Sequence, residues 1–242
     1  MCDKLALSRA ERILDYDQKI LDDPENSNAR TNRRELLNKW YEKDVEIMVQ
    51  VANNEQRQWT EFEIGLPTEK MKTKLQTGYD QVGDYNFTAT YQSTVTLGGL
   101  VAERKSGVDM LGSLSQKERY VNLNQELARF NADPRFSRYG VKNFHIFAEC
   151  TLGFILNSRP PKVVHYLKIQ KNPNYKPKAE TTRLRDHRNS MKGKIWTLAI
   201  RGAPISWEGS RQEAALSYNF AVRHWCTKNH RIIMGVDDEI HN

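Results

Sequence analysis

The chain of 242 residues is long enough for one well-formed core and short for two, so we expect a single domain with additions. No apolar run approaches the roughly 20 residues that a membrane span needs, and residues 1–10 lack the apolar core of a signal peptide. We therefore predict an intracellular protein with no membrane partner. The three cysteines are far apart and form no CxxC pair, which argues against a zinc site and for a reducing compartment.

The net charge of +7 is unevenly distributed along the chain. Residues 1–50 hold 9 Lys and Arg against 11 Asp and Glu, whereas residues 159–201 hold 12 against 2. The second stretch alone more than accounts for the excess. A concentrated basic stretch is typical of a protein that binds a polyanion such as nucleic acid, and the alternative is a solvated loop without a partner.

Two helices are predicted at the N-terminus. Ser8 and Glu11 have capping-box spacing and predict a helix through about Leu21, which the Pro-containing stretch 22–28 ends. A second helix is predicted over 32–43, with an apolar face. We interpret residues 1–44 as an N-terminal helical appendage.

Strands and helices then alternate along the chain. The period-two pattern of 45–51 predicts a strand, 67–75 a short helix, and 82–90 with 94–103 a hairpin. Helical spacing extends over 109–130, and the apolar run 144–151 predicts a buried strand. Residues 159–187 predict an irregular basic excursion with four prolines. A helix over 190–200, a strand over 204–207 and a helix from Ser210 to about Trp225 complete an α/β fold.

The hairpin places three chemically useful side chains together. Asp84 lies near the start of its first strand and Glu103 and Lys105 near the end of its second, so antiparallel pairing brings these ends together. Glu103 and Lys105 are two residues apart and leave the same face of the strand. Two carboxylates and an amine suit phosphodiester hydrolysis, in which oxygen ligands hold Mg²⁺ and a lysine stabilises the developing charge. A charged strand end without chemistry is the alternative.

The sequence motif around these residues is more specific than their spacing alone. Gly83-Asp84-Tyr85 and the stretch from Glu103-Arg104-Lys105-Ser106 to Leu114 resemble the XPF-family nuclease motif, GDY followed by ERKS-x-x-DL-x-x-SL. Phe147-Ala148-Glu149 and the stretches 193–198 and 204–214 also resemble that family. The resemblance covers residues from about 45 to 226.

This resemblance implies a restriction-endonuclease-like fold, a central mixed sheet flanked by helices, over residues 45–242, with the basic excursion at about 159–190. It implies a metal-dependent DNA endonuclease acting on branched, flapped or junction DNA. Asp84, Glu103 and Lys105 would be catalytic, Asp84 and Glu103 would hold Mg²⁺, and Mn²⁺ could substitute.

Two departures from the family pattern affect these expectations. The family's first strand ends in VD-x-RE, but Ala52 and Asn54 replace the acid and the arginine here. Glu55, Glu46 or Glu149 could supply the missing carboxylate, with Glu55 first. The helix-hairpin-helix pair that often follows the nuclease domain is absent, so DNA contacts are predicted elsewhere, at Arg104, Lys162, Lys168, Lys171, Arg183, Arg185 and Arg188.

Two questions stay open at the level of sequence. Ala52 motivates an alternative function, a catalytically weakened nuclease-like module that binds DNA or a protein partner without cutting. Apolar positions on the last helix, Leu216, Phe220 and Trp225, suit an isologous homodimer contact, and packing within the monomer is the alternative.

Overall fold

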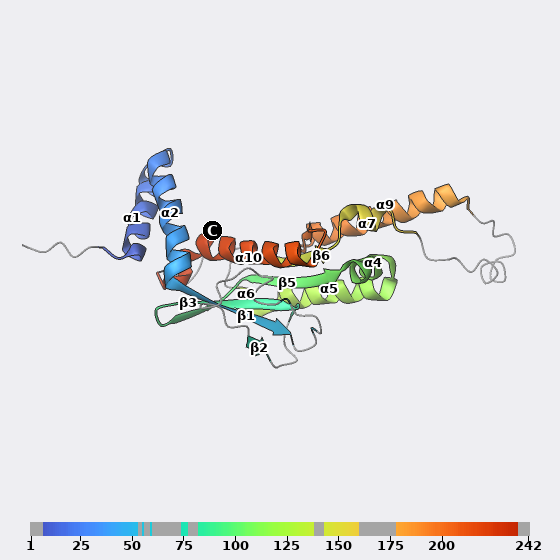
Figure 1. Ribbon diagram of the computed structural model, residues 1–242, viewed down its shortest axis with the longest axis horizontal. Coiled ribbons are helices and arrows are strands. Elements are labelled where there is room, and N and C mark those ends of the chain that lie inside the picture. The colour runs from blue at the N-terminus through green and yellow to red at the C-terminus, as the bar shows by residue number, and fades with distance from the viewer. Residues whose placement is uncertain are drawn as a thin grey trace, which may run out of the picture.

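The computed structural model describes residues 7–52, 55, 59, 74–76, 82–137, 143–159 and 178–236. A mixed sheet lies at its centre, with strand order β2-β1-β3-β5-β6-β7 and β4 paired to β3 (Figure 1). Helices cover the sheet, which confirms the predicted α/β class with a central mixed sheet flanked by helices. The strands are β1 (Val45–Ala52), β2 (Lys74–Gln76), β3 (Tyr85–Tyr91), β4 (Thr94–Leu97), β5 (Leu100–Ser106), β6 (Asn143–Glu149) and β7 (Ile205–Trp207).

Strand directions divide the sheet into two halves. β3 is antiparallel to β1, β4 and β5, whereas β5, β6 and β7 are parallel to one another. Helices cover both faces of the parallel half, where the apolar runs Leu100–Ala102 and Ile146–Ala148 are buried on both sides. At β6, Phe144 contacts Phe130 on one face while Phe147 contacts Tyr218 on the other. Side chains of successive strand residues therefore point alternately toward two different helices.

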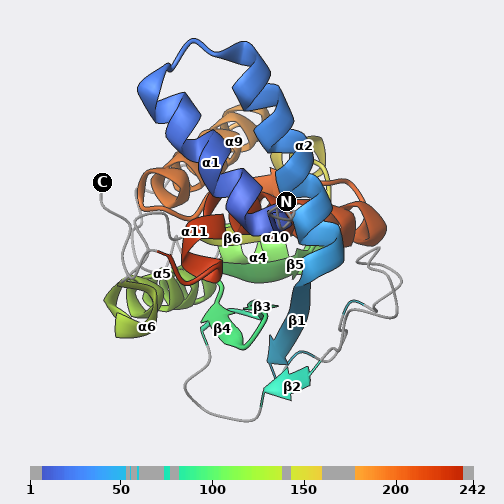
Figure 2. The same ribbon diagram turned by 90° about the vertical axis from the view of Figure 1, so that its left-hand side faces the viewer.

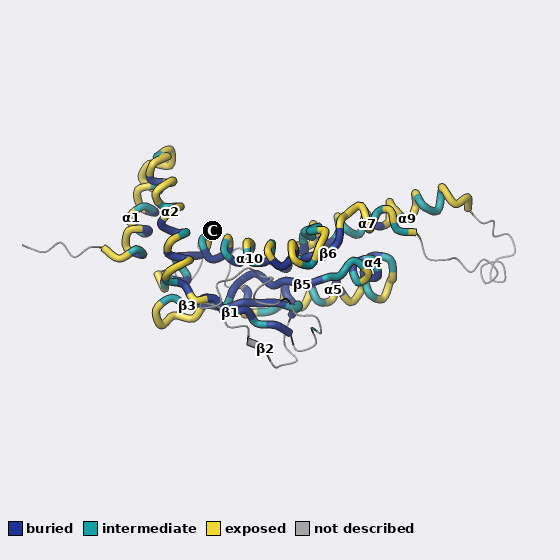
Figure 3. Tube along the Cα trace, viewed as in Figure 1, coloured by how far each residue is buried: buried dark blue, intermediate teal, exposed yellow. Residues whose placement is uncertain are grey.

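Two long helices cover opposite faces of the parallel strands. Phe130 lies on α5 (Lys117–Ala132) and Tyr218 on α10 (Arg211–Lys228), so α5 and α10 sandwich β6. Figure 3 shows the strands as the most buried part of the chain and the outer helices as largely exposed. The other helices are α4 (Gly107–Ser115), α6 (Pro134–Ser137), α7 (Leu152–Leu156), α9 (Glu180–Ile200) and α11 (His230–Ile233).

The N-terminal helices α1 (Arg9–Asp22) and α2 (Ser27–Asp44) form an antiparallel pair that projects from the sheet (Figures 1 and 2). The predicted capping box is present: the Ser8 hydroxyl accepts from the Glu11 amide, and the Glu11 carboxylate accepts from the Ser8 amide. α2 ends at Asp44, and β1 begins at Val45. Whether residues 1–44 act as a separate unit stays a prediction.

A buried ion-pair cluster ties α1 to the last helix. Asp17 on α1 accepts a hydrogen bond from His230 Nε2 at 2.7 Å, and Arg33 on α2 also pairs with it. Arg231 approaches the same carboxylate at 3.8 Å. Because the side chains of Asp17 and His230 are only 7% and 2% exposed, their hydrogen bond satisfies buried polar atoms that water does not reach.

Three predicted elements differ from the structure. The second hairpin strand is broken at Gly98, where a Cβ would lie 2.3 Å from the Phe87 ring, so β4 and β5 are separate. The helical stretch 109–130 is two helices, because Gln116 adopts an extended conformation between α4 and α5. The excursion predicted over 159–187 is already helical from Glu180, while residues 160–177 lie outside the described part.

The helix predicted over 67–75 falls almost entirely outside the described residues, apart from Lys74 and Leu75, which belong to β2. The strand predicted over 144–151 is confirmed as β6. Among the described residues, no helix combines the length and apolarity needed to cross a membrane.

Candidate active site

The backbone around Asp84 joins the two halves of the sheet. The Asp84 amide donates to the Ala102 carbonyl at 2.9 Å, and its own carbonyl accepts from the Ala52 amide at 2.9 Å. Gly83, with φ of +74°, makes this close approach, since a Cβ there would lie 2.5 Å from Val101 Cγ1. The Asp84 carboxylate accepts from the Arg104 amide at 2.8 Å. The backbone of β5 therefore fixes the position of this acid.

Glu103 and Lys105 face the α5 side of the sheet. Glu103 is in register with Ile146, whose neighbour Phe144 on the same face contacts α5. The Lys105 ammonium donates to the Glu103 carboxylate, and the Glu103 side chain is only 4% exposed. Burial by itself lowers the pKa of Lys105, but the charge and hydrogen bond of Glu103 outweigh burial and raise it, so the amine stays charged. The structure thus brings together the three residues that the sequence singled out as catalytic.

The charge at this strand end is unbalanced. Burial raises the pKa of Asp84 well above its ordinary value, and the neighbouring charge of Glu103 raises it further. Burial and Glu103 also raise the pKa of Glu126, on α5, to about 7. Lys105 supplies one positive charge against these three carboxylates, and Arg129 approaches Glu126 from the outside at 3.7 Å. The raised pKa values of Asp84 and Glu126 favour the protonated carboxyl groups when no further cation is present.

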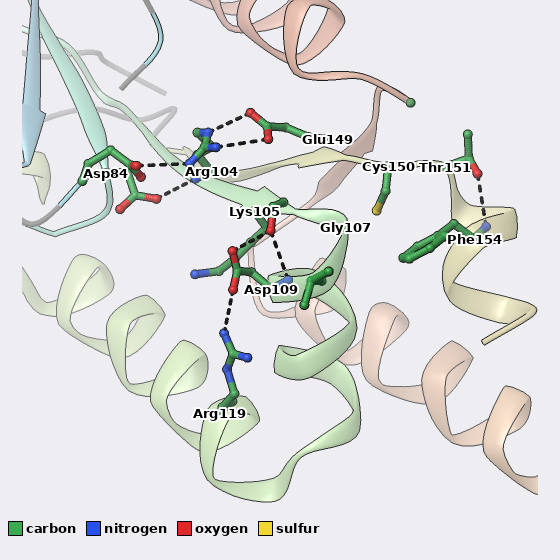
Figure 4. A pocket seen from close by; sticks show the side chains of 14 residues that line it. Asp84, Arg104, Lys105, Gly107, Asp109, Arg119, Glu149, Cys150, Thr151 and Phe154 are labelled. Atoms are coloured by element: carbon green, nitrogen blue, oxygen red, sulfur yellow. Dashed lines mark hydrogen bonds and ion pairs between the residues drawn. The ribbon is translucent and has the colours of Figure 1, made fainter. Parts of the chain in front are cut away.

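A second network occupies the opposite face of the same strand end. Arg104 points to the α10 side, where its guanidinium makes hydrogen bonds of 2.7 and 3.2 Å to Glu149 and 3.1 Å to Glu55 (Figure 4). Trp59 Nε1 donates to Glu149 at 3.0 Å, and the Trp59 amide donates to the Tyr85 hydroxyl at 2.8 Å. This network clamps the ends of β5 and β6 together.

A cleft of about 940 Å³ opens over this end of the sheet and is lined by residues from both networks, including Asp84, Lys105, Glu55 and Glu149. Its outer wall is the start of α4, where Ser106 caps the helix by accepting from the Asp109 amide. Asp109 pairs with Arg119 of α5 at 3.1 Å (Figure 4). The side chain of Arg119 is 40% exposed, and it lines the cleft together with its partner Asp109.

The donor set suits a hard divalent cation. Asp84 and Glu103 offer carboxylate oxygens, the ligands that Mg²⁺ prefers, and burial followed by the charge of Glu103 raises the pKa of Asp84, which a bound cation would lower again. Glu55 is in the cleft but is engaged by Arg104. Across the described residues, no three Asp, Glu, His or Cys side chains are grouped closely enough to hold a metal ion by themselves. A cation bound by Asp84 and Glu103 would need water or substrate oxygens for its remaining positions.

Comparisons with known proteins find a weak structural similarity. No protein-family model matches the chain, and no curated protein matches it. Among solved structures, the chain is similar to XPF from Aeropyrum pernix, with a TM-score of 0.38 and 15% identity over 78% of this chain and 68% of that chain. A similarity this distant says nothing about activity, so the chemistry of the site depends on its own geometry.

Some predicted site residues lie elsewhere. Lys162, Lys168 and Lys171 fall outside the described residues. Arg183, Arg185 and Arg188 lie on α9, which extends away from the sheet (Figure 1). Arg104 was predicted as a DNA contact, but its side chain is 7% exposed and its donors are directed at Glu149 and Glu55, so it serves here to hold the strand ends.

Two further expectations can be compared with the structure. Glu46 was one candidate to replace the missing acid at Ala52, but it pairs with Thr90 at the far end of β1 and cannot reach Asp84. Of the suggested dimer contacts, Leu216 and Phe220 are exposed, whereas Trp225 is 4% exposed and packs against Phe87. Trp225 therefore belongs to the core of the monomer.

Two site residues were missed at the level of sequence. Glu126 reaches the cluster only because α5 packs on β5, and nothing in its helical surroundings distinguishes it from a surface glutamate. Trp59 lies in a stretch without clear periodicity, yet it is 1% exposed and contacts Tyr85, Phe147 and Tyr218. An isolated tryptophan in polar sequence was the only available signal.

Proposed function

We propose that the protein is a Mg²⁺-dependent DNA endonuclease that hydrolyses phosphodiester bonds in branched, flapped or junction DNA. Mn²⁺ would substitute, and such DNA arises in repair and recombination. The observation that carries the proposal is the convergence of Asp84, Glu103 and Lys105 at the end of β5, at and beneath the floor of a polar cleft. The motif resemblance of residues 83–85 and 103–114 supports the choice of DNA as substrate.

Each residue of the site has its own role in the proposed reaction. Asp84 and Glu103 would hold Mg²⁺, which when bound lowers the pKa of a coordinated water and neutralises charge on the phosphate. Lys105 keeps its proton and directs a positive charge at the strand end, where it stabilises the anionic transition state. Arg119, at the cleft wall, holds a phosphate oxygen of the DNA backbone, since guanidinium groups match phosphate geometry.

Ala52 favours a second candidate function, a nuclease-like module that binds DNA or a protein partner without cutting. Ala52 is buried beside Asp84 and contributes no carboxylate, so the site has fewer acids than the family pattern implies. Against this alternative, Asp84, Glu103 and Lys105 are all retained and adjacent. An inactive module has no chemical need for that combination.

Cleavage assays separate the two functions. The full chain is incubated with flap, fork, junction and plain duplex DNA, in Mg²⁺, Mn²⁺ or chelator. We expect metal-dependent cleavage of the branched substrates that is lost in Lys105→Ala and in Asp84→Asn. Lys117→Ala is the matched control, because Lys117 is exposed at the start of α5 outside the cleft. Salt-sensitive binding without cleavage in either metal would reject the endonuclease in favour of the binding module.

A further inference from the structure

Helix α9 presents two faces of different character. Met191 and Leu198 are 1% and 0% exposed, and the half-buried Lys194 on the same face donates to the Leu114 carbonyl at the end of α4. Because residues three, four and seven apart share one side of a helix, this inner face anchors α9 to the body of the protein. Within the part of the chain that the structure describes, the opposite side of the helix is exposed.

The outer face carries a single line of exposed residues. Residues 185, 189, 192, 196 and 200 succeed one another at intervals of three or four and are all exposed. Trp196 is 69% exposed and Ile200 82% exposed, whereas Trp40, Trp59 and Trp225 are each at most 4% exposed. Arg185 and Lys192 supply positive charge toward the N-terminal half, and no acid lies on this line. The line extends over about 22 Å of helix.

We propose that this outer face of α9 binds an unpaired strand of DNA, with Trp196 stacked on a base and Lys192 and Arg185 on the adjoining phosphates. Proteins hold single strands by stacking bases on aromatic rings and by binding the phosphates with cations. The outer face offers both, because Arg185 and Lys192 lie on the same side of the helix as the exposed ring of Trp196. A base that is paired in a duplex has no free face to offer Trp196. The inference rests on the DNA partner of the proposed function but not on its cleavage chemistry.

The charge of the face selects this occupant over a protein partner. Along α9 itself, five Lys and Arg stand against Glu180 and Asp186, and Asp186 is already paired with Lys178 at 2.7 Å. A second copy of this basic face would repel the first, whereas a polyanion with exposed bases satisfies both the charges and the ring. RNA offers the same chemistry, so the test needs an arm for each.

Binding is measured by fluorescence anisotropy with full-length protein that carries Asp84→Asn, so that no strand is cut. The probes are oligothymidine of about a dozen nucleotides, the matching oligouridine and a blunt duplex of equal length. We expect Trp196→Ala to weaken oligothymidine binding about tenfold, in line with the cost of removing one stacked base, and to leave duplex binding unchanged. Trp196→Phe should retain most of the affinity. Phe220→Ala is the control, as an equally exposed aromatic residue on α10.

The salt dependence of binding tests the phosphate contacts of Arg185 and Lys192. Arg185→Gln and Lys192→Gln should each reduce the slope of log affinity against log salt by about 0.7 on the single strand. Unchanged oligothymidine binding in Trp196→Ala overturns the inference, as does a preference for oligouridine. A change in sedimentation of Trp196→Ala with unchanged DNA affinity overturns it too, because the face would then be an interface between proteins. Trp196-dependent binding with no cleavage by the wild type would uphold this site while rejecting the endonuclease.

Discussion

Asp17 and Asp84 are both deeply placed carboxylates, but their surroundings are opposite in sign. Asp17 accepts a hydrogen bond from His230 and lies beside the guanidinium groups of Arg33 and Arg231. Burial alone would raise the pKa of Asp17, yet the hydrogen bond and charge of His230 and the charge of Arg33 lower it overall. Asp84 has other acids beside it, and burial followed by the charge of Glu103 raises its pKa. The neighbours of Asp17 favour its charged form, whereas burial and Glu103 disfavour the charged form of Asp84.

This difference predicts opposite effects of removing the two charges. Asp17→Ala should destabilise the protein by about 3 kcal/mol, because it leaves the buried His230 and two arginines without their carboxylate. Urea unfolding measures the loss. Asp15→Ala on the same helix is the control, since Asp15 pairs with Lys19 in solvent and should cost less than about 0.5 kcal/mol. Equal losses of unfolding free energy in Asp17→Ala and Asp15→Ala would contradict a special role of the buried Asp17 carboxylate.

At the other cluster, Asp84→Asn should leave stability unchanged or raise it by about 1 kcal/mol near pH 8. The amide keeps an oxygen that accepts from the Arg104 N–H and removes the repulsion from Glu103. Thermal unfolding with and without Mg²⁺ sharpens the test. Mg²⁺ should raise the melting temperature of the wild type and not that of the variant, because only a ligand of the folded state stabilises it. A clear loss of stability in Asp84→Asn would assign this acid a structural role.

Glu126 makes the acidic cluster sensitive to pH. Its pKa of about 7 exceeds the ordinary 4.5, so between these values the folded state holds a proton that the unfolded state has released. The stability that the raised pKa of Glu126 contributes is therefore fully present below about pH 4.5 and is lost as pH rises toward 7. Glu126→Gln should unfold like the wild type at pH 4 and be more stable by roughly 1 kcal/mol at pH 8, a figure reduced for solvent screening. Parallel pH profiles for the two proteins would contradict this account.

Arg119→Gln should have the smallest effect on the free energy of unfolding and a larger effect on DNA affinity. Its pair with Asp109 is half exposed, so Arg119→Gln should change the free energy of unfolding by less than about 0.5 kcal/mol. Branched-DNA affinity should fall by a larger factor, about three- to tenfold, because a phosphate contact is lost at the cleft wall. Arg129→Gln, on the same helix, is the control for the removal of one charge from α5.

Local patterns predicted the parts of the fold that depend on local interactions. The capping box at Ser8, the helix that begins after the Ser210 cap, the strand from Val45 and the buried run before Glu149 are all present. The adjacency of Asp84 to Glu103 also followed from antiparallel pairing. In contrast, the helix of α9 before Ser190 has no apolar periodicity, because its exposed face is basic. A helix that buries few side chains leaves little trace in the hydrophobic pattern.

The charged networks were less accessible to sequence reasoning. Arg104 and Lys105 are neighbours in sequence, yet the alternation of the strand directs one to Glu149 and the other to Glu103. Arg104 is held by Glu149 of β6, and the pair of Lys105 and Glu103 lies beside the charge of Glu126 on α5, so the roles depend on tertiary packing. Asp17 and His230 are 213 residues apart, and no local pattern relates them.

That separation affects the order in which the molecule can be completed during synthesis. When α2 leaves the ribosome, Arg33 can pair with Asp17 at once, 16 residues away. His230 lies 213 residues after Asp17 and is translated after all the strands β1 to β7. The contact that joins α1 to α11 can therefore form only after the strands of the central sheet have been synthesised.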